Sequence, residues 1–294
     1  MYYLIYGFLY VLSLLPLRFL YLISDAVYEL IYYVIGYRKK IVMQNLRAAF
    51  PEKTEKERIV ICKKFYKNLC DTFIETIKLI TASGSFIKRH FQGDSKIFDS
   101  INEQGKKCQM HVGHNFNWEL AVMAVPLYCH YPYLDIYLPL NNKISDRLLL
   151  KIRSRTGTIL ISAHEFYKEM LPYRHLPYCI SFVADQNPPD PSKAFWLNFF
   201  NRPAPFIKAP EKSAKGGNTP VVFCHIIKLR RGYYKECNKL ITMSPRDLPE
   251  GKLTAMFVSY LEKVIREQPD MWLWSHRRWK HEYKKEYENL WIGN

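Results

Sequence analysis

Paired cysteines are missing from this sequence. Its seven Cys residues are an odd number, and no two of them stand in a C-x-x-C motif. A disulfide framework and a structural zinc site are therefore not expected. We expect reduced and mostly buried thiols, which is typical of a protein that faces the cytosol.

The sequence also has no internal repeat, no low-complexity linker and no recognised nucleic-acid-binding motif. Its composition excludes disorder, because 48% of the residues are hydrophobic and only 24% are charged. The 294 residues suffice for one large domain or two small ones. Positive charge is abundant, with a formal net charge of +16 and 22 Tyr. A basic surface attracts nucleic acid, anionic lipid or acidic proteins, and the many tyrosines favour a membrane surface among these.

The first 37 residues are apolar and aromatic, but Pro16 and Arg18 interrupt the run of about 20 apolar residues that a transmembrane helix needs. A signal peptide is disfavoured, because a basic start and a small-residue cleavage site are both missing. A transmembrane span, an interfacial or hairpin anchor and a buried core helix remain as alternatives. Between Arg38 and Leu69, ten Lys or Arg residues face three Glu residues. This block favours a membrane anchor over residues 1–37, followed by a cytoplasmic domain over 38–294.

The pattern of residues 38–294 predicts an α/β fold. In a helical region 38–90, apolar residues recur every four positions, as an amphipathic helix requires: Ile61, Phe65, Leu69, Phe73 and Ile77. Over 91–294, strands are expected at 108–112, 134–138, 158–162, 178–184 and 220–227, a hairpin at 228–240, and helices at 118–125, 145–153 and 253–267. This alternation favours a mostly parallel sheet flanked by helices. The segment 186–209 contains five Pro and is expected to be a long functional loop.

A chemical motif lies at residues 111–119, which read H-V-G-H-N-F-N-W-E. We expect a strand to end near Val112, Gly113 to permit a turn, and Asn117 to cap the next helix. His114 would then lie in the turn and Glu119 in the first helical turn. There the carboxylate could orient the imidazole as a general base. No Ser or Cys stands close by, which favours direct attack by a substrate hydroxyl. Alone, the spacing H-x4-E arises often by chance.

The segment G-H-N-F-N-W-E (113–119) resembles the H-x4-D/E motif of glycerolipid acyltransferases, and most closely the G-H-x-x-N-W-E form of the lipid A biosynthesis acyltransferase family. Further segments match that family in the same order: Y-L-P-L-N-N (137–142), R-S-R-T-G (153–157), A-D-Q-N (184–187), F-F-N-R-P (199–203) and W-L-W-S-H-R-R-W-K (272–280). Each motif is modest, but together they are specific and cover nearly the whole chain. The family commonly has an aromatic residue and a Gly where this chain has Asn115 and Phe116.

The resemblance implies a glycerolipid-acyltransferase-like fold and an acyltransferase with His114 and Glu119 as catalytic residues. It implies acyl-carrier protein as donor, a lipid A precursor as acceptor, the cytoplasmic face of a bacterial inner membrane as location, and no metal or cofactor. Six further residues are implied in substrate binding: Arg153, Arg155, Asp185, Gln186, Arg277 and Arg278. The arginines could bind phosphate through their planar guanidinium groups or could have structural roles, and Asp185 could position another group or cap a strand end.

Two alternative functions remain. The acceptor could be another lipid, such as a glycerolipid, an amino-acid lipid or a glycolipid. The chain could instead be a non-catalytic basic module that binds membrane or nucleic acid, because positive charge and tyrosines suit phosphate contact and stacking. The apolar N-terminus argues against a nucleic-acid-binding module, because it would have no purpose there.

Overall fold

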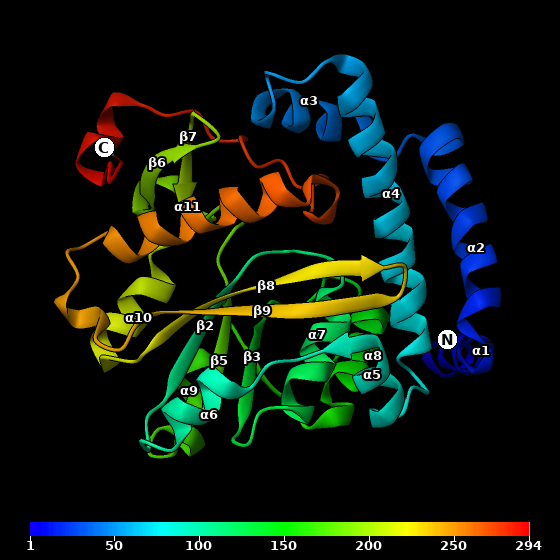
Figure 1. Ribbon diagram of the computed structural model, residues 1–294, viewed down its shortest axis with the longest axis horizontal. Coiled ribbons are helices and arrows are strands. Elements are labelled where there is room, and N and C mark those ends of the chain that lie inside the picture. The colour runs from blue at the N-terminus through cyan, green and yellow to red at the C-terminus, as the bar shows by residue number, and fades with distance from the viewer. Residues whose placement is uncertain (294) are drawn as a thin grey trace.

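A seven-stranded sheet forms the centre of the computed structural model, which describes residues 1–293 (Figure 1). Its strands are β1 (Phe91–Gln92), β2 (Cys108–Val112), β3 (Tyr133–Tyr137), β4 (Ile159–Ser162), β5 (Cys179–Val183), β8 (Val221–Arg230) and β9 (Tyr233–Thr242), in the order β1-β9-β8-β2-β5-β3-β4. Neighbours from β8 to β4 are parallel, β8 and β9 are antiparallel, and β1 runs parallel to β9. The prediction of a mostly parallel sheet is confirmed.

Helices surround the sheet: α1 (Tyr2–Leu14), α2 (Leu17–Glu29), α3 (Lys39–Ala49), α4 (Glu55–Lys78), α5 (Gly84–His90), α6 (Lys96–Asn102), α7 (Trp118–Ala124), α8 (Lys143–Arg153), α9 (Phe166–Met170), α10 (Ala209–Gly217) and α11 (Lys252–Glu267). A π-helical segment, Leu30–Ile35, continues α2. Short 3₁₀ turns lie at Val125–Leu127, Ser154–Thr156, Leu171–Tyr173, Pro191–Lys193, Pro245–Asp247, Pro269–Met271 and Lys285–Leu290.

Two adjacent residues of β2 show that both faces of the sheet are covered. Successive side chains of a strand point to opposite faces. The ring of His111 lies against Phe257 of α11, whereas Met110 belongs to a buried cluster with Phe98 of α6. Helices α11 and α6 therefore lie on opposite faces, and the core forms two layers around β2.

Helix α4 is the long amphipathic helix that the four-residue spacing predicts. Thr54 and Glu57 form a capping box at its start, where each side chain accepts from the other's backbone. Ile61, Phe65 and Leu69 of the predicted apolar stripe are buried, but Phe73 is 60% exposed. The stripe therefore identified the helix correctly, although Phe73 faces away from the core.

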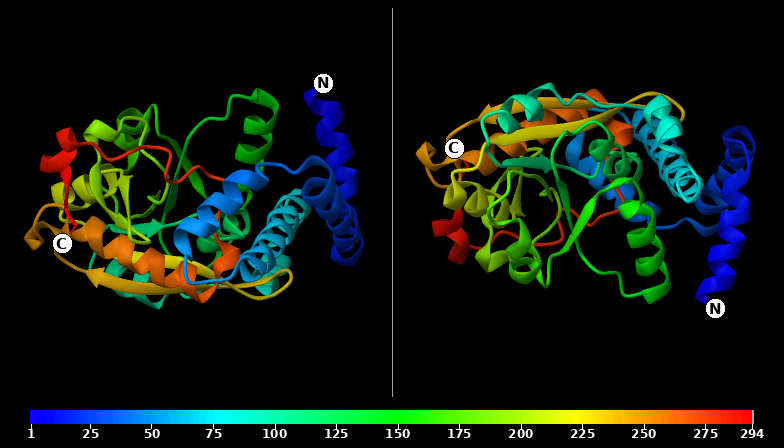
Figure 2. Two further views of the ribbon diagram at one scale, coloured as in Figure 1. Left: turned by 90° about the horizontal axis from the view of Figure 1, so that it is seen from above. Right: turned by 90° about the horizontal axis from the view of Figure 1, so that it is seen from below.

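The N-terminal helices α1 and α2 lie at one end of the molecule, beyond α4, in both views of Figure 2. Helix α2 packs on α4 through a face with Leu20, Ser24 and Tyr28, and the Ser24 hydroxyl donates to Asp71 over 2.7 Å. The outer surfaces of α1, α2 and the following π-helical segment leave large apolar side chains exposed, among them Leu4, Phe8, Val11, Phe19, Leu22 and Val34. No single described helix is long and apolar enough to cross a membrane, but the pair Tyr2–Leu14 and Leu17–Ile35, bent by 119°, has a suitable length and composition.

The segment 186–209 differs in part from the predicted loop, because half of it is a two-stranded antiparallel hairpin of β6 (Phe195–Phe199) and β7 (Arg202–Phe206). Its prolines suggested a loop, since proline cannot donate to a strand ladder. Pro203 and Pro205 stand two residues apart on β7, however, and both strands of a two-stranded sheet are edges that tolerate proline. The apolar run of β6 then provides the buried side.

The cysteines behave as the composition predicts. All seven are free thiols, and five are buried: Cys62, Cys70, Cys108, Cys179 and Cys224. Burial raises the pKa of the Cys62 thiol to about 11, so this group stays protonated and inert at neutral pH. These side chains contribute to packing.

The tip of the β8–β9 hairpin approaches the N-terminal helices at Gly232, which has φ +75°. A Cβ at this position would lie 2.2 Å from the hydroxyl oxygen of Tyr21 on α2. Glycine is thus required twice, for its left-handed backbone and for the close approach of α2.

We predict that Gly232→Ala lowers the free energy of unfolding by about 2 kcal/mol or more, combining left-handed strain of about 1 kcal/mol with the cost of overpacking. The control is Gly105→Ala, which has a similar φ of +66° but open space around the added Cβ, and should cost only about 1 kcal/mol. Denaturant titration in detergent measures both. Equal losses would show that the approach of Tyr21 is unimportant.

Candidate functional site

His114 lies in the turn that joins β2 to α7, as the motif predicts. A Cβ on Gly113 would lie 2.8 Å from Leu261 of α11 and 3.3 Å from the carboxylate of Asp185, so glycine permits both neighbours to approach. Asn117 is the N-cap of α7, and its Oδ1 accepts from the backbone N–H of Leu120 over 3.1 Å. The turn therefore ends in a fixed helix start.

The carboxylate that bonds to His114 comes from Asp185, in the loop after β5. One oxygen of Asp185 accepts from the backbone N–H of His114 over 2.8 Å, and the other lies 2.6 Å from Nδ1 of the imidazole. The indole of Trp272 also donates to Asp185 over 2.7 Å. An ionised carboxylate only accepts, so Nδ1 must carry a proton, and in the neutral imidazole Nε2 then keeps its lone pair. Nε2 lies 3.1 Å from the amide nitrogen of Gln186.

Asp185 stays ionised although it is buried. Burial alone would raise the pKa of its carboxyl, but the charge of His114 and the hydrogen bonds from His114 and Trp272 lower it to about 2. The negative charge of Asp185 is therefore present at every physiological pH, ready to stabilise an imidazolium on His114.

Glu119 lies in the first turn of α7, as the motif predicts, but its carboxylate is hydrogen-bonded to groups other than His114. Its carboxylate is held by Arg153 of α8 through two hydrogen bonds of 2.6 and 2.8 Å, and by the indole of Trp118 over 3.0 Å. The expected bond from Glu119 to the imidazole is replaced by that of Asp185. The physical reason is the bidentate fork of Arg153, which engages both oxygens of the buried carboxylate.

The predicted phosphate-binding arginines have different surroundings. Arg278 is fully buried, donates to Asn187 and to the carbonyl of Pro205, and packs on Phe199 and Phe206. Burial lowers the pKa of Arg278 to about 9, and because its contacts are within the fold, its binding to phosphate stays a prediction that this arrangement disfavours. Arg153 is occupied by Glu119, whereas Arg277 is exposed.

Arg155 is also exposed, and one of its guanidinium nitrogens donates to the carbonyl of Leu79 at the end of α4. That contact leaves the rest of the fork at the surface, where an anion could reach it. Of the four arginines, Arg155 and Arg277 are thus the ones exposed at the outer surface.

A cavity of about 1090 Å³ adjoins His114, which is large for a ligand-binding site. Most of its wall is apolar, and β2, α7 and α8 contribute Met110, Val112, Ala121, Val122, Leu149 and Leu150 to it. His114, Gln186 and Arg153 are among the polar residues of the wall. The site therefore offers a base beside a space that suits a hydrocarbon chain.

The C-terminal segment holds the turn from another side, which the sequence did not predict. The backbone N–H of Phe116 donates to the carbonyl of Met271 over 2.9 Å, and Asn115 pairs with Trp272 in an isolated antiparallel bridge. The start of the W-L-W-S-H-R-R-W-K segment thus supports the turn at residues 113–117 that carries His114. Its repeated tryptophans were the signal for such a buried role.

This combination of an α/β sheet, an oriented histidine and a large apolar cavity suits an enzyme that handles acyl chains. The family model of the bacterial lipid A biosynthesis acyltransferase matches residues 1–281, and the chain belongs to this family. The protein is therefore an acyltransferase, and the resemblance seen in the motifs is confirmed.

Curated relatives agree with this assignment. The lipid A biosynthesis palmitoleoyltransferase of Escherichia coli (strain K12) is 22% identical over 254 residues, which cover 83% of this chain and 79% of that protein. The lipid A biosynthesis acyltransferase of Haemophilus influenzae is 23% identical over 254 residues, covering 83% of this chain and 78% of that protein. The family supports acyl transfer in lipid A biosynthesis.

We predict that Asp185→Asn lowers the free energy of unfolding relative to wild type, and that the size of this loss depends on pH. The folded-state pKa of Asp185, about 2, lies below the ordinary value of 3.8. Its ionisation therefore stabilises the fold above about pH 4, and this contribution of about 2 kcal/mol is lost as the pH falls toward 2.

Denaturant titrations at several pH values measure the difference. It should be larger at about pH 6 than at about pH 2.5, and the exposed Asp247→Asn variant controls for the loss of one charge. A difference that does not change with pH would contradict the ionised, bonded state of Asp185.

Proposed function

We propose that this acyltransferase transfers a fatty acyl chain from acyl-carrier protein to a hydroxyl group of a lipid A precursor, with His114 as general base. The observation that carries the proposal is the bond between Asp185 and Nδ1 of His114, which leaves Nε2 as an acceptor at the wall of the apolar cavity. A base must reach the proton that it removes, and Nε2 is the atom that the site presents.

The reaction proceeds by direct attack. Nε2 of His114 takes the proton of the acceptor hydroxyl while its oxygen bonds to the thioester carbonyl carbon, which gives a tetrahedral intermediate. When the carbon–sulfur bond breaks, the imidazolium returns the proton to the thiolate, and the products are an ester and the free thiol of the carrier. Asp185 stabilises the imidazolium between these two steps. The amide nitrogen of Gln186, 3.1 Å from Nε2, donates to the lone pair of Nε2 before substrate binds. Once the acceptor hydroxyl takes its place, this amide donates to the hydroxyl or to the developing oxyanion.

Glu119 and Arg153 have a supporting role in this proposal. They form a buried ion pair at the start of α7 and the end of α8, and Arg153 lines the cavity. The pair fixes the distance between two helices that border the acyl chain. Breaking it from either side would leave one buried charge without its partner.

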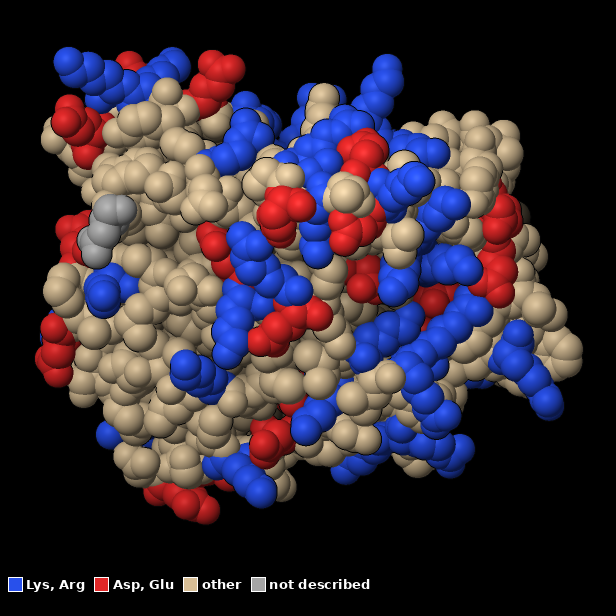
Figure 3. Space-filling model, turned by 45° about the horizontal axis from the view of Figure 1, so that its top comes forward, with Lys and Arg blue, Asp and Glu red and all other residues tan. Residues whose placement is uncertain are grey.

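The acyl chain of the donor occupies the apolar cavity. Burying each methylene stabilises the bound chain by about 0.8 kcal/mol, so a long chain gains much of its affinity there. Carrier protein and acceptor are both anionic, and Figure 3 shows Lys and Arg side chains gathered over the region of α3 and α4. Exposed Lys40, Arg47, Lys56, Lys64 and Lys67 lie on these helices. Arg155 and Arg277 are the candidates for phosphate contact.

The exposed surfaces of the four N-terminal helices support a membrane location. The exposed apolar side chains of α1 and α2 suit the acyl region of a bilayer, and the basic residues of α3 and α4 suit anionic headgroups. We therefore place the protein at the cytoplasmic face of the bacterial inner membrane, where donor and acceptor meet.

We predict that His114→Ala and Asp185→Asn each lower kcat by at least about 10²-fold, because the first removes the base and the second the group that orients it. The assay measures acyl transfer from acyl-carrier protein to a lipid A precursor by purified protein in detergent. His130→Ala is the control, since this exposed histidine also pairs with an aspartate, Asp99. Normal turnover by a folded His114→Ala protein would remove His114 from the mechanism.

The same assay separates the two carboxylates. Full turnover by Asp185→Asn, together with loss of turnover by a stably folded Glu119→Gln, would make Glu119 the partner of the base. Mass spectrometry of lipid A from cells with and without the protein identifies the acceptor, and an unchanged lipid A profile would favour another lipid as acceptor.

We predict that the double variant Phe8→Glu/Val11→Glu binds anionic liposomes at least tenfold more weakly than wild type. Both side chains are 67% exposed on α1, and burying an apolar side chain of this size contributes about 1.5–3 kcal/mol. Co-sedimentation measures binding, and Leu176→Glu, at a position that is 48% exposed in a distant loop, is the control. Equal binding by all proteins would show that α1 does not contact the bilayer.

A further inference from the structure

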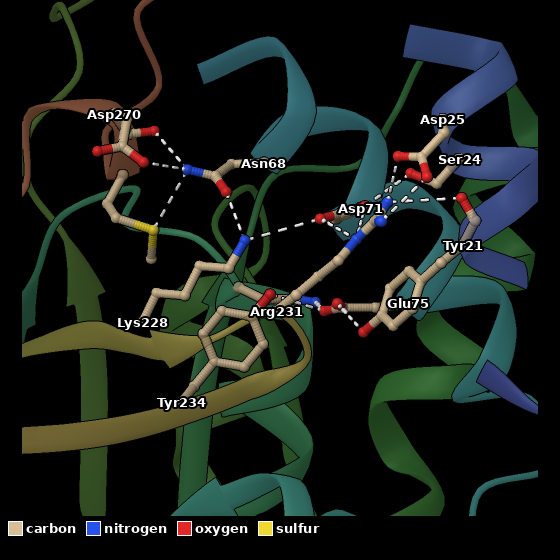
Figure 4. Close-up of polar contacts among 12 residues, drawn as sticks. Tyr21, Ser24, Asp25, Asn68, Asp71, Glu75, Lys228, Arg231, Tyr234 and Asp270 are labelled. Carbon is tan, nitrogen blue, oxygen red and sulfur yellow. Dashed lines mark hydrogen bonds and ion pairs between the residues drawn. The ribbon is translucent and has the colours of Figure 1, made fainter. Parts of the chain in front are cut away.

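Glu75 on α4 is a buried carboxyl that the reaction above does not use (Figure 4). It is 6% exposed and accepts three hydrogen bonds: from the Tyr21 hydroxyl over 2.7 Å, from the Asn117 amide over 2.8 Å and from the Tyr234 hydroxyl over 2.9 Å. The three donors come from α2, from the end of the catalytic turn and from β9. An ionised carboxylate, which only accepts, fits three converging donors.

The charge of Glu75 depends on these hydrogen bonds. One turn earlier on α4, Asp71 forms ion pairs with Arg231 and Lys228. Arg231 also pairs with Asp25, and the ion pairs among the residues of Figure 4 do not include Glu75. Burial raises the pKa of Glu75, hydrogen bonds from Asn117 and Tyr21 oppose this, and nearby Asp71 adds to the rise. Each donor therefore helps to keep the carboxylate ionised.

Asn117 connects this carboxylate to the catalytic turn. The side chain is fully buried, donates to Glu75 with its nitrogen and caps α7 with its oxygen. A rotation of the amide away from Glu75 would also break the cap. Glu75 therefore fixes the end of the turn three residues after His114, while Asp185 fixes the turn at His114 itself.

We propose that Glu75 is a positioning residue for acyl transfer, and that Tyr21 makes helix α2 part of the support of the catalytic turn. The inference rests on the proposed role of His114. When Glu75 is ionised, all three donors have an acceptor; when it is protonated, one oxygen becomes a donor and the match is lost. The helices that carry the exposed apolar surface thus also hold the base in place, through Tyr21, Glu75 and Asn117.

Tyr21→Phe tests the proposal, because it removes one hydrogen bond to Glu75 and keeps the ring. A lost hydrogen bond to a charged group raises the pKa of Glu75 by about one unit or more. Activity needs the ionised form, so the acid limb of the kcat profile should move to higher pH by about one unit. On the acid limb, kcat at a given pH should fall about tenfold, with KM for donor and acceptor within about twofold of wild type.

Two further variants separate positioning from stability. Tyr128→Phe removes a comparable hydrogen bond, from its hydroxyl to the carbonyl of Phe91 over 2.7 Å, and should keep kcat and the pH profile. Glu75→Gln removes the titrating group, so its kcat should be low at every pH and its profile should lack the limb that moves in Tyr21→Phe. Should Glu75→Gln fail to fold, the comparison of the two tyrosine variants still decides.

Amide hydrogen exchange over residues 114–120 gives a readout that does not need activity. Exchange there should be faster in Tyr21→Phe than in wild type and unchanged in Tyr128→Phe. The positioning role of Glu75 would be overturned if Tyr21→Phe had the kcat and the acid limb of the pH profile of wild type. Equal rates of amide exchange over residues 114–120 in Tyr21→Phe and Tyr128→Phe would overturn it as well. Absence of acyl transfer by wild type would instead refute the proposed function, and the exchange measurement would still test the link from Tyr21 to the turn.

Discussion

The buried carboxylate of Asp185 joins the three parts of the chain that form the site. It accepts from the backbone and the imidazole of His114, after β2, and from Trp272 in the C-terminal segment. Because β2 and β5 are parallel neighbours, their carboxyl ends meet at one edge of the sheet, where α/β proteins place their ligand sites. This one carboxylate therefore orients the His114 imidazole, supports the turn through the backbone of His114, and joins the C-terminal segment to the turn through Trp272.

Much of the fold could be predicted, because its strands are short apolar runs between turns. The segment 108–112 is β2 to the residue, and the helix expected at 253–267 is α11 with one residue more. The hairpin β6–β7 was missed because its prolines normally indicate a loop, and their tolerance on an edge strand depends on pairing.

The site was predictable only where its residues are close in sequence. His114 in a turn and Asn117 as N-cap follow from local chemistry. The partner of the imidazole lies 71 residues away, and the partner of Glu119 lies 34 residues away, so spacing alone could not find the carboxylate that bonds to the imidazole. Likewise, nothing local distinguishes the buried Arg278 from the exposed Arg277 beside it.

The catalytic turn is thus held between two acids, Asp185 at its start and Glu75 at its end, and the second connects it to the N-terminal helices. Nitrogen NMR of the His114 imidazole tests the central claim, that Asp185 holds the proton on Nδ1 and leaves Nε2 free to act as base. At neutral pH the account predicts the Nδ1–H tautomer in wild type and in Glu119→Gln, and a mixture of tautomers in Asp185→Asn. An Nε2–H tautomer in wild type, or a tautomer that changes in Glu119→Gln but not in Asp185→Asn, would contradict it.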